Sequence, residues 1–446
     1  MRPRTMLLLF IMVGLGGAFM LPAGPPRGPR LQQPAALLDP PQKLQIFYTP
    51  PVLVEAGEPV RIPVDAVCIT TQGNPCSSRV TFGTRVGDEP WNVSTRDAAP
   101  GLAFDVAPAA ARAAEGSVSF FVRAQTETGL TSSVGSEDAP LRFWVTDRLP
   151  RVRLPEIPFG RVRKPTTALF LPWGSGPMRA GIAPGKESLT VGPSAFDVDD
   201  QGRLYVLDSE QDRLAVFSDG RLGREVQLPL SATDDVAVAD DGRAFVLNQL
   251  DDTVAVRLVT PAGSLGPRVP VGEALSSHLA AAGDAAYVNV LPLDGWVEAP
   301  TAPGLPSEVP SPPSVGRPVA PEAELLRVGN GSDVRLATVR GGVVSDAVKL
   351  VSDLRLGDVA MAEPDGGSGY WCVVHVWREG PLAADQYDVV HVNGAEILQA
   401  FAVANREYAE TPPLSRFRLG GDGALYQLSS SPSGMRILRY ELGREG

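Results

Sequence analysis

The stretch Gly192–Gly220, GPSAFDVDDQGRLYVLDSEQDRLAVFSDG, decides the fold class of this chain. It contains three short runs rich in Val, Leu, Tyr and Phe, separated by turns that contain Asp and Gly: Ala195–Val198, Arg203–Leu207 and Arg213–Phe217. Runs of this length between turn residues are typical of strands in an antiparallel meander.

The same pattern returns later in the chain. Asp234–Gly263 repeats the turn and the hydrophobic run that follows it, and weaker copies occur at Leu279–Asn289, Asp358–Val376 and Phe417–Leu442. The first three turn glycines are 40 and 41 positions apart: Gly202, Gly242 and Gly283. A period of about 40 residues with four short strands per unit is the signature of a β-propeller blade. We therefore predict an all-β chain whose ring has six blades, with five as the alternative.

The best-defined unit resembles the NHL-repeat family of propellers. Gly192–Phe217 carries the pattern GPS-x-F-x-V-D-x-x-G-x-L-Y-V-L-D-S-x-x-x-R-L-x-V-F. The resemblance implies a propeller, expected over residues 166–446, and does not imply one activity. We expect an early strand, Ala168–Leu171 or Ser188–Val191, to close the ring on Met435–Leu442.

Residues 43–148 are predicted to form a separate unit. Six candidate strands are separated by turn-forming residues: Leu44–Tyr48, Val60–Val64, Val80–Thr84, Leu102–Val106, Val118–Ala124 and Leu141–Val145. About seven short strands over roughly 100 residues suggest an immunoglobulin-like β-sandwich. The end of this unit also resembles the last hairpin of bacterial extracellular immunoglobulin-like modules. Cys68 and Cys76 are too close in sequence for a disulfide between sheets. We predict that they form a disulfide that holds a loop, with free thiols as the alternative.

Three further segments complete the predicted organisation. Residues 25–42 form a Pro-rich linker, residues 149–165 link the two domains, and residues 291–321 interrupt the propeller with nine prolines. A long stretch without periodicity inside a ring is either a flexible excursion or a functional loop.

Residues 1–24 begin with a basic segment followed by the apolar run Met6–Leu21. This predicts a secretory signal, and an uncleaved membrane anchor is the alternative. The Arg bias over Lys, with abundant Ala, Gly and Pro, indicates a GC-rich bacterial genome. We therefore expect an exported protein that is periplasmic, at the cell surface or secreted.

The net charge of the 446 residues is −11, with a sequence pI near 5.0. A nucleic-acid partner is not expected, because such proteins need a basic surface.

Two polar residues occupy matching places after a repeated hydrophobic run. Asp208 follows Tyr205-Val206-Leu207, and Asn248 follows Phe245-Val246-Leu247. Propellers of the gluconolactonase type hold a divalent cation with inward acids and amides, so Asp208 and Asn248 are candidate metal ligands. The third and fourth units offer only Val290 and Val374 at these places. The alternative is that Asp208 bonds backbone amides of its own loop or Arg213. No cofactor is predicted, with a divalent cation as the alternative.

Three tryptophans fall in or near predicted propeller loops, which carry binding in this fold. Trp173, Trp296 and Trp377 are candidate binding residues, with packing as the alternative role. His375 and His391 are expected on paired strands, but two histidines do not make a zinc site.

The chain lacks a nucleophile elbow, a phosphate loop, a His-Glu-x-x-His motif and a Cys-x-x-Cys motif. Our first hypothesis is an exported, non-catalytic binding or scaffold protein. Its propeller would recognise a protein, a polysaccharide or a small ligand of the cell envelope, with a membrane tether through Met6–Leu21 as a variant. The alternative is a metal-dependent propeller enzyme of the lactonase or lyase type.

Overall fold

The computed structural model describes residues 41–49, 51–106, 116–183, 190–230, 234–250, 253–272, 275–291, 295–299, 314–320, 322–380, 384–405, 407–409 and 416–443. The predicted signal or anchor and nearly all of the predicted linker at 25–42 lie outside them. Within the described residues, we find no helix of the length and apolarity that a membrane crossing requires.

The N-terminal part is a sandwich of two sheets. One sheet has the order β1-β3-β6, with bounds Pro41–Tyr48, Val60–Thr70 and Ala103–Val106. The other has the order β2-β9-β7-β4-β5, with β8 paired to β7. Its bounds are Leu53–Glu55, Leu141–Thr146, Ser117–Thr126, Ser78–Val86, Asn92–Asp97 and, for β8, Thr131–Val134. All six predicted strands of this part are confirmed.

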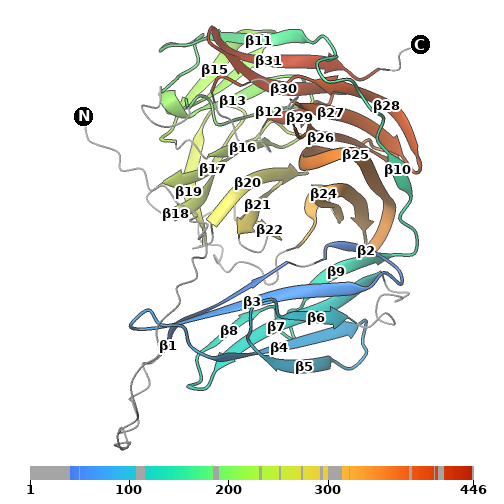
Figure 1. The fold of residues 1–446 in the computed structure, drawn as a ribbon. Coiled ribbons are helices and arrows are strands. Elements are labelled where there is room, and N and C mark those ends of the chain that lie inside the picture. The colour runs from blue at the N-terminus through green and yellow to red at the C-terminus, as the bar shows by residue number, and fades with distance from the viewer. Residues whose placement is uncertain are drawn as a thin grey trace, which may run out of the picture. The chain divides into compact units, whose positions relative to one another are not determined.

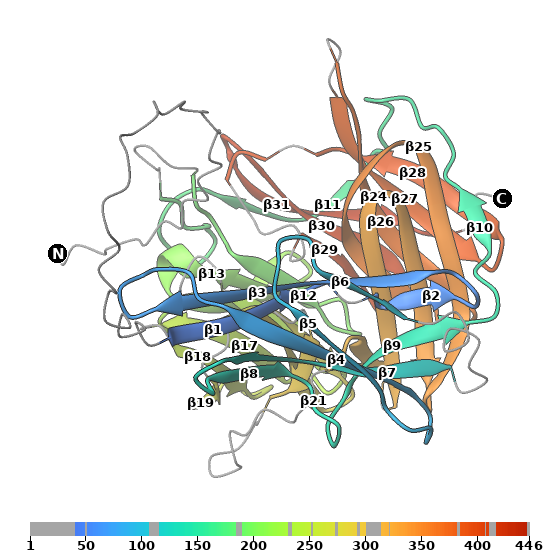
Figure 2. The same cartoon turned by 60° about the horizontal axis from the view of Figure 1, so that its bottom comes forward.

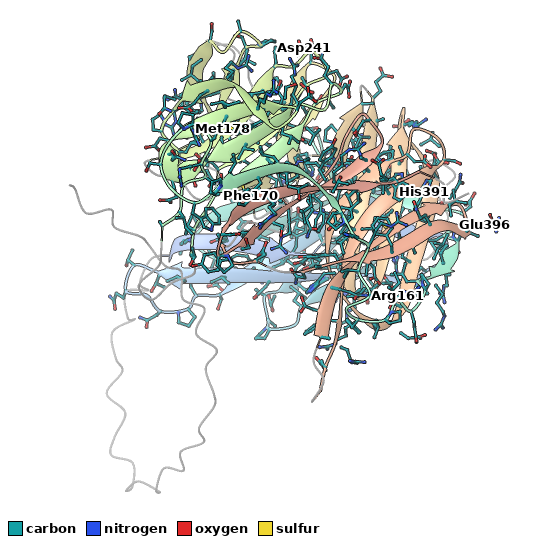
Figure 3. The ribbon with its side chains drawn as sticks, turned by 90° about the horizontal axis from the view of Figure 1, so that it is seen from above. Arg161, Phe170, Met178, Asp241, His391 and Glu396 are labelled. Atoms are coloured by element: carbon teal, nitrogen blue, oxygen red, sulfur yellow. A yellow bond between two sulfur atoms is a disulfide. The ribbon has the colours of Figure 1, made fainter. Side chains whose placement is uncertain are left out.

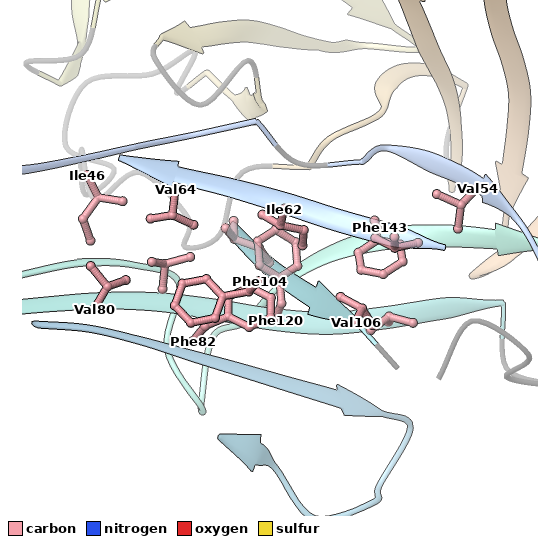
Figure 4. Packing of buried hydrophobic residues seen from close by; sticks show 14 of the residues in the cluster. Ile46, Val54, Ile62, Val64, Val80, Phe82, Phe104, Val106, Phe120 and Phe143 are labelled. Atoms are coloured by element: carbon pink, nitrogen blue, oxygen red, sulfur yellow. The ribbon is translucent and has the colours of Figure 1, made fainter. Parts of the chain in front are cut away.

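Alternation along these strands builds the sandwich core. In β3, Ile62 and Val64 are buried while Pro63 and Asp65 are exposed, because successive side chains of a strand point to opposite faces. Figure 4 shows the inward residues of both sheets packed together, including Phe82 and Phe104, whose rings stack at 4.9 Å. The immunoglobulin-like assignment stays a prediction.

The predicted disulfide between Cys68 and Cys76 is confirmed. Cys68 lies near the end of β3, and the chain turns back so that the Cys76 amide donates to the Cys68 carbonyl at 3.0 Å. The bond therefore holds a surface turn of one sheet. The remaining cysteine, Cys372, is fully buried, as expected for a small core residue.

The rest of the chain forms mainly antiparallel sheets, whose strands follow one another in sequence except for β10 and β11. The first two are β12-β13-β14-β15 and β16-β17-β18-β19. Their bounds are Ala195–Val198, Leu204–Asp208, Arg213–Ser218 and Arg221–Gln227, then Asp235–Val238, Ala244–Leu250, Thr253–Val259 and Leu265–Gly272. The 3-10 turn η2 (Ser209–Gln211) joins β13 to β14. The third sheet is β20-β21-β22, with bounds Leu275–Ala282, Ala285–Leu291 and Gly295–Glu298.

A seven-stranded sheet follows, in the order β23-β24-β25-β26-β27-β28 with β10 paired to β25. Its bounds are Arg317–Ala320, Ala323–Arg340, Val343–Pro364, Gly369–Arg378, Ala384–Asn393, Glu396–Val403 and, for β10, Arg151–Arg153. Figure 2 shows β24 to β27 side by side. The last sheet is β11-β31-β30-β29, with bounds Thr166–Pro172, Gly434–Glu441, Ala424–Ser431 and Phe417–Leu419.

The innermost strands of these sheets meet their neighbours in sequence around a closed path. Contacts join β12 to β16, β16 to β20, β20 to β23, β25 to β29, and β29 back to β12 (Figure 1). Arg317 of β23 is paired with Glu363 of β25, which completes the path. This is the architecture of a β-propeller, so the predicted all-β fold is confirmed.

The number of blades stays a prediction, with six favoured and five as the alternative. The described strands form five sheets in the ring. One of them has seven strands, because β25 is 22 residues long and pairs with β24 over its first part and with β26 over its second part. The turn glycines of the repeated pattern, which also include Gly366 and Gly423 of its weaker copies, all have positive φ, which suits their tight turns: Gly202, Gly242, Gly283, Gly366 and Gly423.

Ring closure follows one of the two predicted routes. β11 pairs antiparallel with β31, from Thr166 opposite Arg439 to Pro172 opposite Gly434. An early strand thus completes the last sheet, which ties the two ends of the propeller together.

Two predicted irregular segments contain strands. Part of the predicted linker at 149–165 forms β10, which runs parallel to β25. Both ends of the predicted insertion at 291–321 also form strands, β22 and β23, because each pairs with a neighbour in the ring. Most of that stretch lies outside the described residues.

Candidate functional site

The innermost strands of the propeller surround a cavity of about 500 Å³. Its wall is built by residues of β12, β16, β20 to β25 and β29, and by the turns that follow some of these strands. Pockets of this size accept small molecules. The cavity is therefore the candidate functional site.

One side of the cavity holds a charged cluster from four sheets. Arg418 of β29 lies between two carboxylates, with its Nε 3.3 Å from Asp197 Oδ1 and its Nη2 3.5 Å from Asp235 Oδ1. His278 Nδ1 lies 3.8 Å from Asp235 Oδ2. Backbone amides also bind the acids, since Val238 donates to Asp197 at 2.7 Å and Leu279 donates to Asp235 at 3.0 Å.

The two carboxylates of this cluster differ in acidity. Burial raises the pKa of Asp197 to about 6, although Arg418 and the Val198 and Val238 amides act in the opposite direction. Burial also acts to raise the pKa of Asp235, but His278 and Arg418 outweigh it and hold that pKa below its usual value. The cavity therefore contains one carboxylate that takes up a proton in mildly acidic solution and one that stays ionised.

The other side of the cavity combines a second ion pair with apolar surface. Arg317 pairs with Glu363 at 2.6 Å and also donates to the Ala362 carbonyl at 2.7 Å. Leu325 and Met361 belong to the same sheet as this ion pair, and Trp296, Leu279 and Phe417 add apolar side chains from other sheets. A site with apolar walls and a few placed polar groups can orient a polar ligand.

Asp208, a predicted metal ligand, does not line the cavity. It is 1% exposed at the end of β13 and accepts hydrogen bonds from the Gly181 amide and from Gln211. Arg213, which is also buried, lies 3.2 Å from its Oδ2. Burial raises the pKa of Asp208, against these donors. The Arg213 contact matches the alternative given above, whereas the bonded amide comes from Gly181 rather than from the loop of Asp208 itself. The role of Asp208 in metal binding stays a prediction.

Asn248, the second predicted metal ligand, also lies outside the cavity lining. Its amide nitrogen donates to Asp234 and to the Pro229 carbonyl, both at 2.9 Å. No described contact joins Asn248 to Asp208. Throughout the described part of the chain, no three His, Cys, Asp or Glu side chains are grouped so that they could hold a metal ion.

The three predicted tryptophans have different surroundings. Trp296 lies in β22 and lines the cavity. Trp173 packs against the core of the first and last sheets, and its indole donates to the Ser431 carbonyl at 2.8 Å. Trp377 is 37% exposed and lies under the Arg355 guanidinium, 5.3 Å from the ring centre. The structure therefore brings only Trp296 of these three to the cavity.

His375 and His391 lie on the paired strands β26 and β27, as expected, but they do not meet. His375 is bonded to Asp385 at 3.1 Å. His391, labelled in Figure 3, is bonded to Asp365 at 2.8 Å and stacks on Trp371. Each histidine thus has its own partners, away from the cavity.

Sequence reasoning missed most of the charged cavity residues. Arg418, Asp235, Arg317 and Glu363 were not singled out. The usable signal was a polar side chain inside the innermost strand of each repeat, where an apolar one is expected. The repeated positions at the end of the second strand of each unit lead instead to Asp208 and Asn248.

Comparison with known proteins gives a fold-level likeness. No family model and no curated protein matches the chain. A catalytically inactive virginiamycin B lyase from Staphylococcus aureus with quinupristin is 12% identical, covering 74% of this chain and 96% of that chain, with a TM-score of 0.27. A PQQ-bound aldose sugar dehydrogenase from Streptomyces coelicolor is 14% identical, covering 59% and 99%, with a TM-score of 0.33.

A gluconolactonase from Xanthomonas campestris is 12% identical, covering 64% of this chain and 90% of that chain, with a TM-score of 0.23. Identities and TM-scores this low carry no argument about activity.

Proposed function

We propose that this protein is an exported, non-catalytic binding protein whose propeller cavity takes a sugar unit of an envelope polysaccharide. The observation that carries the proposal is the cavity of about 500 Å³, which combines Trp296 with buried carboxylates. This volume suits one or two sugar rings. Carboxylates accept hydrogen bonds from hydroxyl groups, and an aromatic ring packs against the apolar face of a sugar.

Export is part of the same proposal. The apolar run Met6–Leu21 after a basic start supports it, and so does the disulfide between Cys68 and Cys76. Disulfides persist mainly in oxidising compartments such as the periplasm and the cell surface.

The alternative, a metal-dependent lactonase- or lyase-type enzyme, requires inward acids and amides around a cation. Asp208 and Asn248, the predicted ligands, are bonded to Arg213 and Asp234 respectively. These contacts among the described residues therefore do not favour a cation site at Asp208 and Asn248.

The test is calorimetric titration of the exported full-length protein with a panel of monosaccharides and disaccharides, comparing Trp296→Ala with Trp377→Ala. The mass of the recovered protein also reports whether residues 1–24 are removed. We expect at least one sugar to bind, with an affinity reduced about fivefold to tenfold by Trp296→Ala, since aromatic packing is worth about 1 kcal/mol. Trp377→Ala is the matched control, because this tryptophan lies on the surface. If no sugar binds, or both variants bind alike, the proposal is wrong.

A further inference from the structure

We infer that the sugar bound in the cavity carries a positively charged amine, held at the mouth by Asp200 and Asp240. This inference rests on the proposed function and adds the charge of the ligand. The two aspartates occupy corresponding turns of neighbouring sheets, Asp200 between β12 and β13 and Asp240 between β16 and β17. Both line the cavity, and both are exposed to solvent.

The turns themselves do not account for these two carboxylates. In the first turn, Asp199 Oδ1 already accepts from the amides of Gln201 at 3.0 Å and Arg203 at 2.9 Å. In the second turn, Asp241 Oδ1 accepts from the Arg243 amide at 3.0 Å.

Asp200 and Asp240 accept none of the hydrogen bonds found among the described residues. Each turn thus has one aspartate that holds the backbone and one whose carboxylate is available to a ligand.

The protein also makes room for one of them. A Cβ atom at Gly421, in the turn after β29, would lie 2.4 Å from Asp200 Oδ1. Such an approach is sterically forbidden, so a side chain at this position would displace the carboxylate. Gly421 lines the cavity as well. Asp200 therefore lies against the turn of the neighbouring sheet, at the entrance.

The other acids of the cavity wall already have cationic partners. Asp197 and Asp235 share Arg418, Asp199 pairs with Arg203, and Glu363 pairs with Arg317. Asp200 and Asp240 take part in none of the ion pairs found among the described residues, although Arg327 also lines the cavity. A concave site concentrates the field of such charges, which attracts cations and repels anions. Trp296 adds a ring face that also attracts a cation.

The test uses four probes that share a sugar ring and differ in charge: glucose, glucosamine, N-acetylglucosamine and glucuronate. The variant is Asp200→Asn/Asp240→Asn in the full chain. Its matched control is Asp65→Asn/Asp105→Asn, which removes two exposed acids of the sandwich. A cation about 4 Å from a carboxylate in water gains roughly a fivefold increase in affinity. With one or both carboxylates within reach of the amine, we therefore expect glucosamine to bind about fivefold to 25-fold more tightly than N-acetylglucosamine at low salt.

That preference should disappear in Asp200→Asn/Asp240→Asn and persist in the control. It should also weaken at about 0.2 M salt, because exposed charges are screened. If glucose, N-acetylglucosamine and glucosamine bind alike, or if the variant keeps the preference, the inference is overturned while the proposed sugar site stands. If no sugar of either panel binds, the proposed function fails together with the inference.

Discussion

Asp197 shows how the fold changes the chemistry of a single residue. Its side chain is 16% exposed, and burial raises its pKa to about 6. Because the pKa is higher in the folded than in the unfolded chain, this group favours folding below pH 4. That contribution is lost as the pH rises through 6. The cavity is correspondingly more negative at neutral pH than in mild acid.

Asp197→Asn should therefore change the pH dependence of stability. A shift of about two pKa units corresponds to at most about 3 kcal/mol. We expect the free energy of unfolding of the wild type, relative to that of the variant, to fall by up to this amount between pH 4 and pH 7. Denaturant titrations across this range measure it, with Asp105→Asn as an exposed control. If the difference in the free energy of unfolding between wild type and variant does not vary with pH, the raised pKa of Asp197 is contradicted.

The pairing of β11 with β31 is the element on which ring closure depends. Leu169 and Leu171 of β11 are buried in the core that the first and last sheets share. At Gly434 of β31 an added Cβ would lie 2.3 Å from the Leu171 carbonyl oxygen and 2.8 Å from the ring of Phe170, which is labelled in Figure 3. Gly434 also has a φ of 151°, which disfavours other residues.

Gly434→Ala should accordingly lower the free energy of unfolding by about 2 kcal/mol or more, because the backbone cannot move away without breaking the strand pair. The matched control is Gly443→Ala, two residues beyond β31, where a Cβ meets nothing within 4 Å. Thermal and denaturant unfolding of both variants measure the effect. Equal stabilities would show that closure tolerates a wider spacing than the structure has.

At the scale of the whole molecule, the sandwich and the propeller share a core. Leu53, Trp144 and Leu149 of the N-terminal part pack with Leu326 and other residues of β24. Beside this core, Arg335 of β24 binds Glu58 through both guanidinium ends, each at 2.9 Å. The neighbouring guanidinium lowers the pKa of Glu58 despite its burial. The two parts are therefore joined by packing as well as by the chain.

Glu58→Ala should lower the free energy of unfolding by about 1–2 kcal/mol, since it leaves Arg335 partly buried without this bidentate partner. Asp97→Ala is the control. It breaks the exposed Arg79–Asp97 ion pair, and pairs of this kind contribute little. Denaturant unfolding compares the two variants. If Glu58→Ala is as stable as the control, the ion pair does not hold the junction.

The sequence by itself determined the features that depend on local pattern. The three runs in Gly192–Gly220 became β12, β13 and β14 almost to the residue, because strand and turn signals act over a few positions. The disulfide was predictable because its two cysteines are only eight positions apart. The closing strand β11 was predictable because the last sheet of the ring needs a strand to pair with.

Only the tertiary structure decided where the polar side chains meet. Arg418 lies more than 200 positions after Asp197, yet ring closure places them 3.3 Å apart. Asp208 has the spacing of a ring ligand, but the fold turns it to Arg213 and the Gly181 amide. The physical reason is that a repeat pattern specifies how each strand pairs within its sheet. The side chains that enter a common cavity depend on how all the sheets pack around it.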